Sequence, residues 1–183
     1  MTLKVVNILG EPGSGKSTTT AGLTAQMAIR GHQVELVQEA AKDYVWEAVS
    51  DNSGKIIAPY ILNDQIFLFA EQNRRIERLR QKREYAIVEC PLLMSLVYQR
   101  ESYYHSFTQL VLEVYSSYNN INIFLKREHG YDSVGRVQSE EETNTLRDAI
   151  KNILYDNQIE YKEFSTHKHI AEEIADYLES IKK

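Results

Sequence analysis

Short apolar runs alternate along this chain with longer segments of helical periodicity. The apolar runs predict five strands, at Leu3–Leu9, Val34–Val37, Tyr85–Val88, Ile121–Leu125 and Ile159–Phe164. The spacing of apolar residues elsewhere predicts helices at Lys16–Arg30, Ala40–Val49, Pro59–Arg83, Leu92–Gln99, Phe107–Tyr118, Glu140–Tyr155 and His169–Ile181. Because strands alternate with helices, the pattern predicts βαβ units, and therefore an α/β fold with a parallel sheet.

The loops that follow the strands are the most informative segments, because ligands of parallel sheets bind at the carboxyl ends of the strands. Two segments read as loops from their polar composition, Asp51–Gly54 and Lys126–Gln138. Three of the eight glycines, Gly10, Gly13 and Gly15, fall within six residues directly after the first strand. The sequence has no internal repeat and no linker, so we expect one domain over residues 1–183.

Composition excludes several classes of protein. The 183 residues carry a formal charge of -5, which disfavours a polynucleotide as the main partner, although local basic patches leave one open. A single cysteine, Cys90, excludes an intrachain disulfide. No apolar run approaches the roughly 20 residues that a membrane span needs, and the N-terminus has no apolar leader segment. We therefore expect a cytoplasmic protein without a membrane partner.

The glycine cluster fits the pattern G-x-x-x-x-G-K-[ST] of a phosphate-binding loop. An apolar strand precedes it and a helix follows, as such a loop requires. Glycines let backbone N–H groups converge on phosphate oxygens, the lysine reaches the β- and γ-phosphates, and the hydroxyl ligates Mg²⁺. The residues expected to bind the phosphates of ATP are Gly10, Glu11, Pro12, Gly13, Ser14, Gly15, Lys16, Ser17 and Thr18.

This motif makes the chain resemble the P-loop NTPases, and its short length resembles their nucleoside and nucleotide kinases. The resemblance implies a three-layer fold with a five-stranded parallel sheet flanked by helices. It also implies a helical acceptor-binding region at about residues 40–83 and a lid loop at about residues 126–139. The arginines of such lids stabilise the transferred phosphoryl group, and here Arg136 is the first match and Arg127 the second. The alternative is that this segment is only a solvated polar loop.

A closer similarity is to small kinases of the nicotinamide riboside kinase type and their phage and bacterial relatives. After the second strand comes Glu39, followed by the aromatic residues Tyr44 and Trp46, an arrangement similar to that of the deoxynucleoside kinases. In that family the glutamate takes the proton from the attacking hydroxyl, which makes Glu39 the candidate general base. The family's proline after this glutamate is replaced by Ala40. Glu39 could instead be a structural acid in the first turn of a helix.

A second acid, Glu89, ends the third strand, where P-loop enzymes place a carboxylate that holds Mg²⁺ through water. The kinases usually have aspartate here, often followed by arginine, whereas this chain has Glu89 followed by Cys90. We expect Ser17 and Glu89 to form the metal site. The two glutamates could also exchange roles, with Glu39 at the metal and Glu89 as the base.

The helix predicted at Pro59–Arg83 carries the only dense basic segment, Asn73–Arg83. Its arginines either pair with Glu71 and Glu77 on a solvated face or clamp a phosphate of a substrate. Earlier on the same helix, Gln65 could read the edge of a base and Phe67 or Phe69 could stack on it. At helical spacing the two phenylalanines equally fit a hydrophobic core.

Two further sets of residues are candidates for binding, one near the end of the chain and one among the tyrosines. The resemblance places the loop after the last strand beside the adenine, so His167 is a further candidate for nucleotide binding. The tyrosines within Tyr98–Tyr118 suit a pocket for a ring or the contacts of a homodimer, and the sequence leaves both open.

These observations predict a Mg²⁺- and ATP-dependent phosphotransferase that acts on a small molecule, either a nucleoside or a nucleotide. Lys16, Glu39 and Arg136 would form its catalytic group. Two other functions remain open: a kinase of a modified base within DNA, and a nucleotide-controlled switch or ATPase that phosphorylates no metabolite. The sequence does not identify the acceptor, distinguish ATP from GTP, or fix the oligomeric state.

Overall fold

Five parallel strands form the central sheet of the computed structural model, which describes residues 2–45, 49–50, 56–57, 60–100, 102–126 and 140–181. The sheet has the order β2-β5-β1-β6-β7. Its strands are β1 (Lys4–Leu9), β2 (Val34–Val37), β5 (Tyr85–Val88), β6 (Asn119–Lys126) and β7 (Lys162–Ser165). All four neighbouring pairs are parallel, which confirms the predicted five-stranded parallel sheet.

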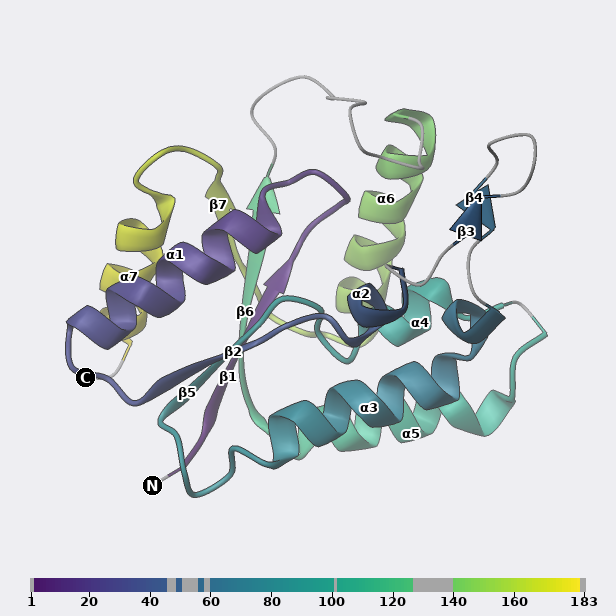
Figure 1. Cartoon of the computed structure of the whole chain (residues 1–183), viewed down its shortest axis with the longest axis horizontal. Helices are drawn as coiled ribbons and strands as arrows, with labels where there is room; N and C mark the ends of the chain where they lie inside the picture. The colour runs from purple at the N-terminus through teal and green to yellow at the C-terminus, as the bar shows by residue number, and fades with distance from the viewer. Residues whose placement is uncertain are drawn as a thin grey trace.

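Helices connect the strands and cover both faces of the sheet (Figure 1). They are α1 (Lys16–Ile29), α2 (Ala40–Val45), α3 (Gln65–Glu77), α4 (Met94–Tyr98), α5 (His105–Ser116), α6 (Glu140–Asp156) and α7 (Ile170–Ser180). The first and last helices, α1 and α7, lie together on one face, and α3, α4, α5 and α6 lie on the other.

Alternation along the strands produces a separate hydrophobic core on each face. In β1, Val6 and Ile8 pack with Leu23 and Met27 of α1, whereas Val5 points into the opposite core. Each of these side chains is almost completely buried. Because successive side chains of a strand point to opposite faces, an apolar run such as β1 is what a sheet covered on both sides requires.

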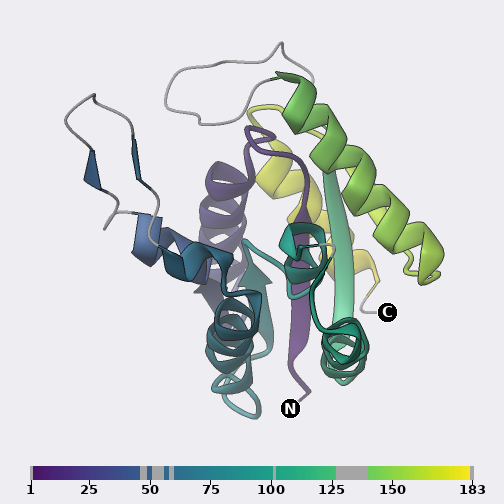
Figure 2. The ribbon, with the colours of Figure 1, turned by 90° about the vertical axis from the view of Figure 1, so that its right-hand side faces the viewer.

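Several predicted helices are shorter in the structure, among them the one expected at Leu92–Gln99, which is α4. The helix expected at Ala40–Val49 ends at Val45, and Val49–Ser50 instead forms β3, which pairs antiparallel with β4 (Ile56–Ile57). This pair of strands was not predicted, and Figure 2 shows it projecting from the body of the protein. The predicted loop Asp51–Gly54 lies outside the described residues.

The helix expected at Pro59–Arg83 is divided at Asp64. The 3₁₀ helix η1 (Tyr60–Asn63) precedes it and α3 follows. The backbone of Asp64 is not helical, and its carboxylate accepts a hydrogen bond from the N–H of Phe67 at 3.0 Å. An aspartate in this position caps a new helix, which explains why the segment predicted as one helix forms two.

Candidate active site

The loop between β1 and α1 has the backbone geometry of a phosphate cradle. Gly10, Gly13 and Gly15 have φ values of 147°, 80° and 82°, a region that other residues rarely adopt. A Cβ atom on Gly10 would lie 2.5 Å from Ser14 Oγ and 3.0 Å from the carbonyl oxygen of Leu125. The backbone therefore favours glycine at all three positions, and the space around Gly10 also excludes a side chain there.

The N-terminus of α1 is open toward this loop. The helix has no side-chain cap at Gly15 and no acidic residue in its first turn. The first N–H groups of a helix have no partner within it, and the helix dipole adds positive potential at that end. An uncapped N-terminus that follows a glycine loop is suited to bind phosphate.

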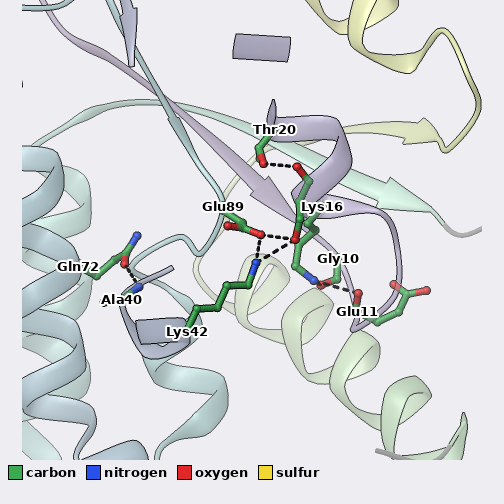
Figure 3. Close-up of polar contacts among 9 residues, drawn as sticks. Gly10, Glu11, Lys16, Thr20, Ala40, Lys42, Gln72 and Glu89 are labelled. Atoms are coloured by element: carbon green, nitrogen blue, oxygen red, sulfur yellow. Dashed lines mark hydrogen bonds and ion pairs between the residues drawn. The ribbon is translucent and has the colours of Figure 1, made fainter. Parts of the chain in front are cut away.

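Lys16 curves back over the loop that precedes it. Its Nζ donates to the carbonyl oxygens of Gly10 at 2.9 Å and of Glu11 at 3.0 Å (Figure 3). Burial lowers the pKa of Lys16, and the nearby carboxylates, Glu39 first, oppose that effect. This side chain is thus held at the mouth of the phosphate cradle.

The two predicted acids follow the adjacent strands β2 and β5 and therefore lie at the same edge of the sheet. Val37 of β2 and Val88 of β5 are partners in the sheet, so Glu39 and Glu89 follow at neighbouring positions. The N–H of Glu89 donates to the carbonyl of Val37 at 3.0 Å, which fixes the backbone there. The carboxylate of Glu89 accepts a hydrogen bond from the hydroxyl of Ser17. The structure therefore brings Ser17, Glu39 and Glu89 together as expected.

The two carboxylates have opposite electrostatic environments. Burial raises the pKa of Glu39, although Lys16 and Lys42 partly oppose it. Burial acts in the same direction on Glu89, but hydrogen bonds from Lys42 and Ser17 outweigh it and hold the pKa of Glu89 below its ordinary value. Glu89 is therefore the more firmly ionised acid, and Glu39 is the one with greater affinity for a proton.

Lys42 was not among the residues expected at the site. It lies on α2, and its Nζ is 2.9 Å from Ser17 Oγ and forms an ion pair with Glu89. Figure 3 shows the side chain of Lys42 reaching from α2 to the carboxylate of Glu89. Its position three residues after Glu39 was the available signal, but a single lysine in a short helix is not distinctive in sequence.

Two cavities meet at Glu39. The first, of about 420 Å³, is lined by the phosphate loop together with Ser17, Thr18, Lys42 and Glu89. The second, of about 370 Å³, extends from there between α2, α3 and α4. The residues common to both are Glu39, Cys90, Pro91, Met94 and Tyr98. Glu39 is thus placed where a molecule in one cavity would meet a molecule in the other.

The second cavity is apolar with a few amide groups. Gln72 is buried, and its Oε1 accepts a hydrogen bond from the N–H of Ala40 at 2.8 Å. That contact orients the amide, and its Nε2 has no hydrogen-bond partner among the described residues. Gln65 also lines this cavity, as predicted for a residue that reads a base, and Gln72 was missed. Buried N–H donors are nearly always paired, so Gln72 is suited to meet an acceptor atom of a ligand.

The other predicted residues lie elsewhere or are not described. Arg127 and Arg136 fall outside the described residues, as does most of the predicted lid. His167 lines neither cavity, and its Nε2 is 2.8 Å from Glu173 of α7. Of the aromatic candidates of α3, Phe69 is buried against Phe107 in the core, as in the structural alternative. Phe67 is half-buried and packs edge-on against Tyr44, and neither phenylalanine lines the two cavities.

The basic segment Asn73–Arg83, which begins on α3, also favours its structural alternative. Arg75 pairs with Asp43 and with Glu71, and Arg80 pairs with Glu77. None of the arginines between Asn73 and Arg83 lines either cavity. These ion pairs are those of a solvated surface rather than of a phosphate clamp.

The described part of the chain has neither a cluster of metal ligands nor a membrane-spanning helix. No group of three or more histidine, cysteine, aspartate or glutamate side chains is arranged to hold a metal ion. A magnesium ion bound with nucleotide needs only one or two protein ligands, so the Ser17–Glu89 pair is still compatible with it. None of the described helices is both long and apolar enough to cross a bilayer.

Comparisons with known proteins agree with this architecture. The family model described as "AAA domain" matches residues 5–172. No curated protein matches the chain significantly. Among solved structures, thymidylate kinase from Ehrlichia chaffeensis superposes with a TM-score of 0.66 at 15% identity, covering 97% of this chain and 100% of its own. The APS kinase CysC of Mycobacterium tuberculosis, solved as a cysteine-to-alanine mutant, gives a TM-score of 0.49 at 10% identity, with 98% and 97% covered. The superposition on the thymidylate kinase shows that the fold is that of the P-loop kinases.

Proposed function

Because the chain belongs to the AAA domain family and has the fold of the P-loop kinases, we propose that it is a Mg²⁺- and ATP-dependent kinase of a small nucleoside-type molecule. The observation that carries this proposal is the position of Glu39 in the wall shared by the two cavities. A phosphate cradle on one side and an apolar cavity on the other match the needs of a reaction between two bound substrates.

The first cavity would bind the donor. Lys16 and the N–H groups of the loop would hold the phosphates of ATP, and Arg136, with Arg127 second, is the predicted cation of the lid. Ser17 and Glu89 would hold Mg²⁺, directly or through water. Their oxygens are the type of ligand that Mg²⁺ prefers, and an ammonium group already lies against both of them. When bound, the metal neutralises charge that develops on the phosphates.

Glu39 would act on the acceptor. Its carboxylate takes the proton of the acceptor hydroxyl while that oxygen bonds to the γ-phosphorus and the bond to the bridging oxygen of ADP breaks. The raised pKa of Glu39 supports this role, because a base must have affinity for the proton that it removes. Glu89, whose pKa is lowered, is better suited to the metal.

The second cavity favours an uncharged acceptor. Its described lining residues include the carboxylate of Glu39 and no lysine or arginine. A nucleoside monophosphate would place its own phosphate in this cavity, in addition to the phosphates of ATP in the first. None of the described lining residues offers a cation to pair with it. A planar base with a carbonyl oxygen or ring nitrogen would instead pair with Gln72 Nε2 and pack against Leu68 and Met94. We therefore place nucleosides ahead of nucleotides as acceptors.

The test is a transfer assay with ATP labelled at the γ-phosphate. The acceptor panel contains ribonucleosides, deoxyribonucleosides, nicotinamide riboside, nucleoside monophosphates and an oligonucleotide. We expect Mg²⁺-dependent transfer of label to one or more nucleosides. Transfer only to the oligonucleotide would contradict the small-molecule acceptor, and release of inorganic phosphate with no dependence on any acceptor would indicate a switch or ATPase instead.

A further inference from the structure

Lys42 occupies the space between the two residues assigned to the metal. Its Nζ is 2.9 Å from Ser17 Oγ and pairs with Glu89 Oε1, while the hydroxyl of Ser17 also donates to Glu89. The carboxylate of Glu89 is nearly buried, with a side-chain exposure of 6%, whereas Lys42 extends in from the surface with 42% exposed. A half-exposed lysine thus brings its charge to a carboxylate that water hardly reaches.

An ammonium group here makes the same contacts that a metal ion would make. Both are cations and both need the lone pairs of Ser17 Oγ and Glu89 Oε1. The two cannot occupy that position together, because of their mutual repulsion and because each oxygen would have to serve both. Direct binding of a metal to Ser17 Oγ and Glu89 Oε1 therefore requires that Lys42 withdraw.

The surrounding charges explain why a cation is needed before the metal arrives. The first cavity contains two carboxylates, Glu39 and Glu89, and among its described lining residues Lys16 and Lys42 are the cations. Lys16 is occupied by the carbonyl oxygens of Gly10 and Glu11. Lys42 is thus the group that directly compensates Glu89.

We propose that Lys42 is a displaceable counter-cation of the metal site. It holds Ser17 and Glu89 together before nucleotide binds, and it sets how strongly nucleotide affinity depends on Mg²⁺. The inference rests on the proposed function, because it takes Ser17 and Glu89 as the ligands of the metal. Lys42 is a positioning residue in this account, since it acts through Ser17 and Glu89.

The proposal makes a prediction for the coupling between metal and nucleotide. Without Mg²⁺, Lys42 shields the phosphates of a nucleotide from Glu89. With Mg²⁺, Lys42 must be displaced, which weakens the gain from the metal. Removing the ammonium therefore enlarges the ratio of the ADP affinity in excess Mg²⁺ to that in EDTA. We expect an increase of about tenfold for Lys42→Met, within the usual range of coupling between two bound ligands.

The experiment is isothermal titration calorimetry of ADP into the full chain, in EDTA and in excess Mg²⁺. The variants are Lys42→Met and Lys42→Gln, so that one remains measurable if the other fails to fold. Lys151→Met is the matched control, because Lys151 is 39% exposed and pairs with Glu163 at 2.6 Å on the surface of α6. Its affinity ratio should equal that of the wild type.

The outcomes separate the two proposals. A larger ratio in the Lys42 variants, with the control unchanged, supports the counter-cation. An unchanged or smaller ratio, with ADP still bound in the presence of Mg²⁺, overturns the role of Lys42 and leaves the proposed function standing. A wild-type protein that binds no ADP with or without Mg²⁺ overturns the proposed function and this inference with it.

Discussion

At the scale of single residues, Glu39 lies at the junction of the two cavities. Glu39 is half-buried beside Lys16 and Lys42, and desolvation raises the pKa of its carboxyl group despite these two cations. A group of this kind costs stability when it is ionised, and enzymes retain such groups because the reaction needs them. Glu39 therefore provides a test in which stability and activity should change in opposite directions.

The substitution Glu39→Gln should lower kcat by about 10²- to 10⁴-fold, the usual contribution of a general base. The stabilising contribution of a carboxyl group with a raised pKa is complete below its unfolded value and is lost as the pH rises through its folded value. Glutamine does not ionise, so the variant should melt at a higher temperature than the wild type at pH 8, and the difference should shrink at pH 5. Thermal melts and steady-state kinetics over this range would check both effects. A kcat within twofold of the wild type would make Glu39 structural.

Gln72 provides a test of the acceptor cavity. In Gln72→Glu the oxygen that accepts from the N–H of Ala40 is kept and the N–H donor is lost. We expect the KM for the acceptor to rise roughly tenfold, equivalent to about one neutral hydrogen bond, while the KM for ATP stays the same. Gln109→Glu, at an exposed position of α5, is the control. An acceptor KM that is equal in both variants would remove Gln72 from the binding site.

At the scale of elements, the strands of the central sheet were predictable, but the division of the longest predicted helix and the two-residue strands were not. The strands and helices around the phosphate loop were predicted correctly because their apolar periodicity is unbroken. The break at Asp64 was missed because apolar residues continue on both sides of it, and only the capping contact with Phe67 ends one element and begins the next. The two-residue strands β3 and β4 are too short to show any alternation.

The cap at Asp64 should be measurable through the helix that it begins. We expect Asp64→Ala to lower the free energy of unfolding by about 1 kcal/mol, which corresponds to a decrease in Tm of roughly 2–4 °C for a chain of this length. Asp156→Ala is the control, because an acid at the end of α6 lies at the wrong end of the helix dipole to stabilise it. Equal denaturation midpoints for the two variants would show that the cap contributes nothing.

At the scale of the whole molecule, topology explains why distant residues could be grouped from sequence alone. Parallel strands bring their carboxyl ends to one edge, so the residues that follow β1, β2 and β5 had to meet there. Contacts that depend on side-chain reach, such as those of Lys42 and Gln72, have no such rule and became visible only in the structure. The acidic net charge of -5 is compatible with phosphate binding because positive potential is local, at Lys16, Lys42 and the N-terminus of α1.

In the proposed reaction, the phosphate loop holds a nucleotide whose γ-phosphoryl group passes to a molecule in the adjoining cavity. The most direct test is single-turnover transfer of labelled phosphoryl from ATP to the acceptor, compared between the wild type and Lys16→Ala. We expect the variant to keep the circular dichroism spectrum of the wild type and to lose at least about 10³-fold of the transfer rate, because positioning and charge neutralisation account for nearly all of this catalysis. Transfer by Lys16→Ala at the rate of the wild type would contradict the account.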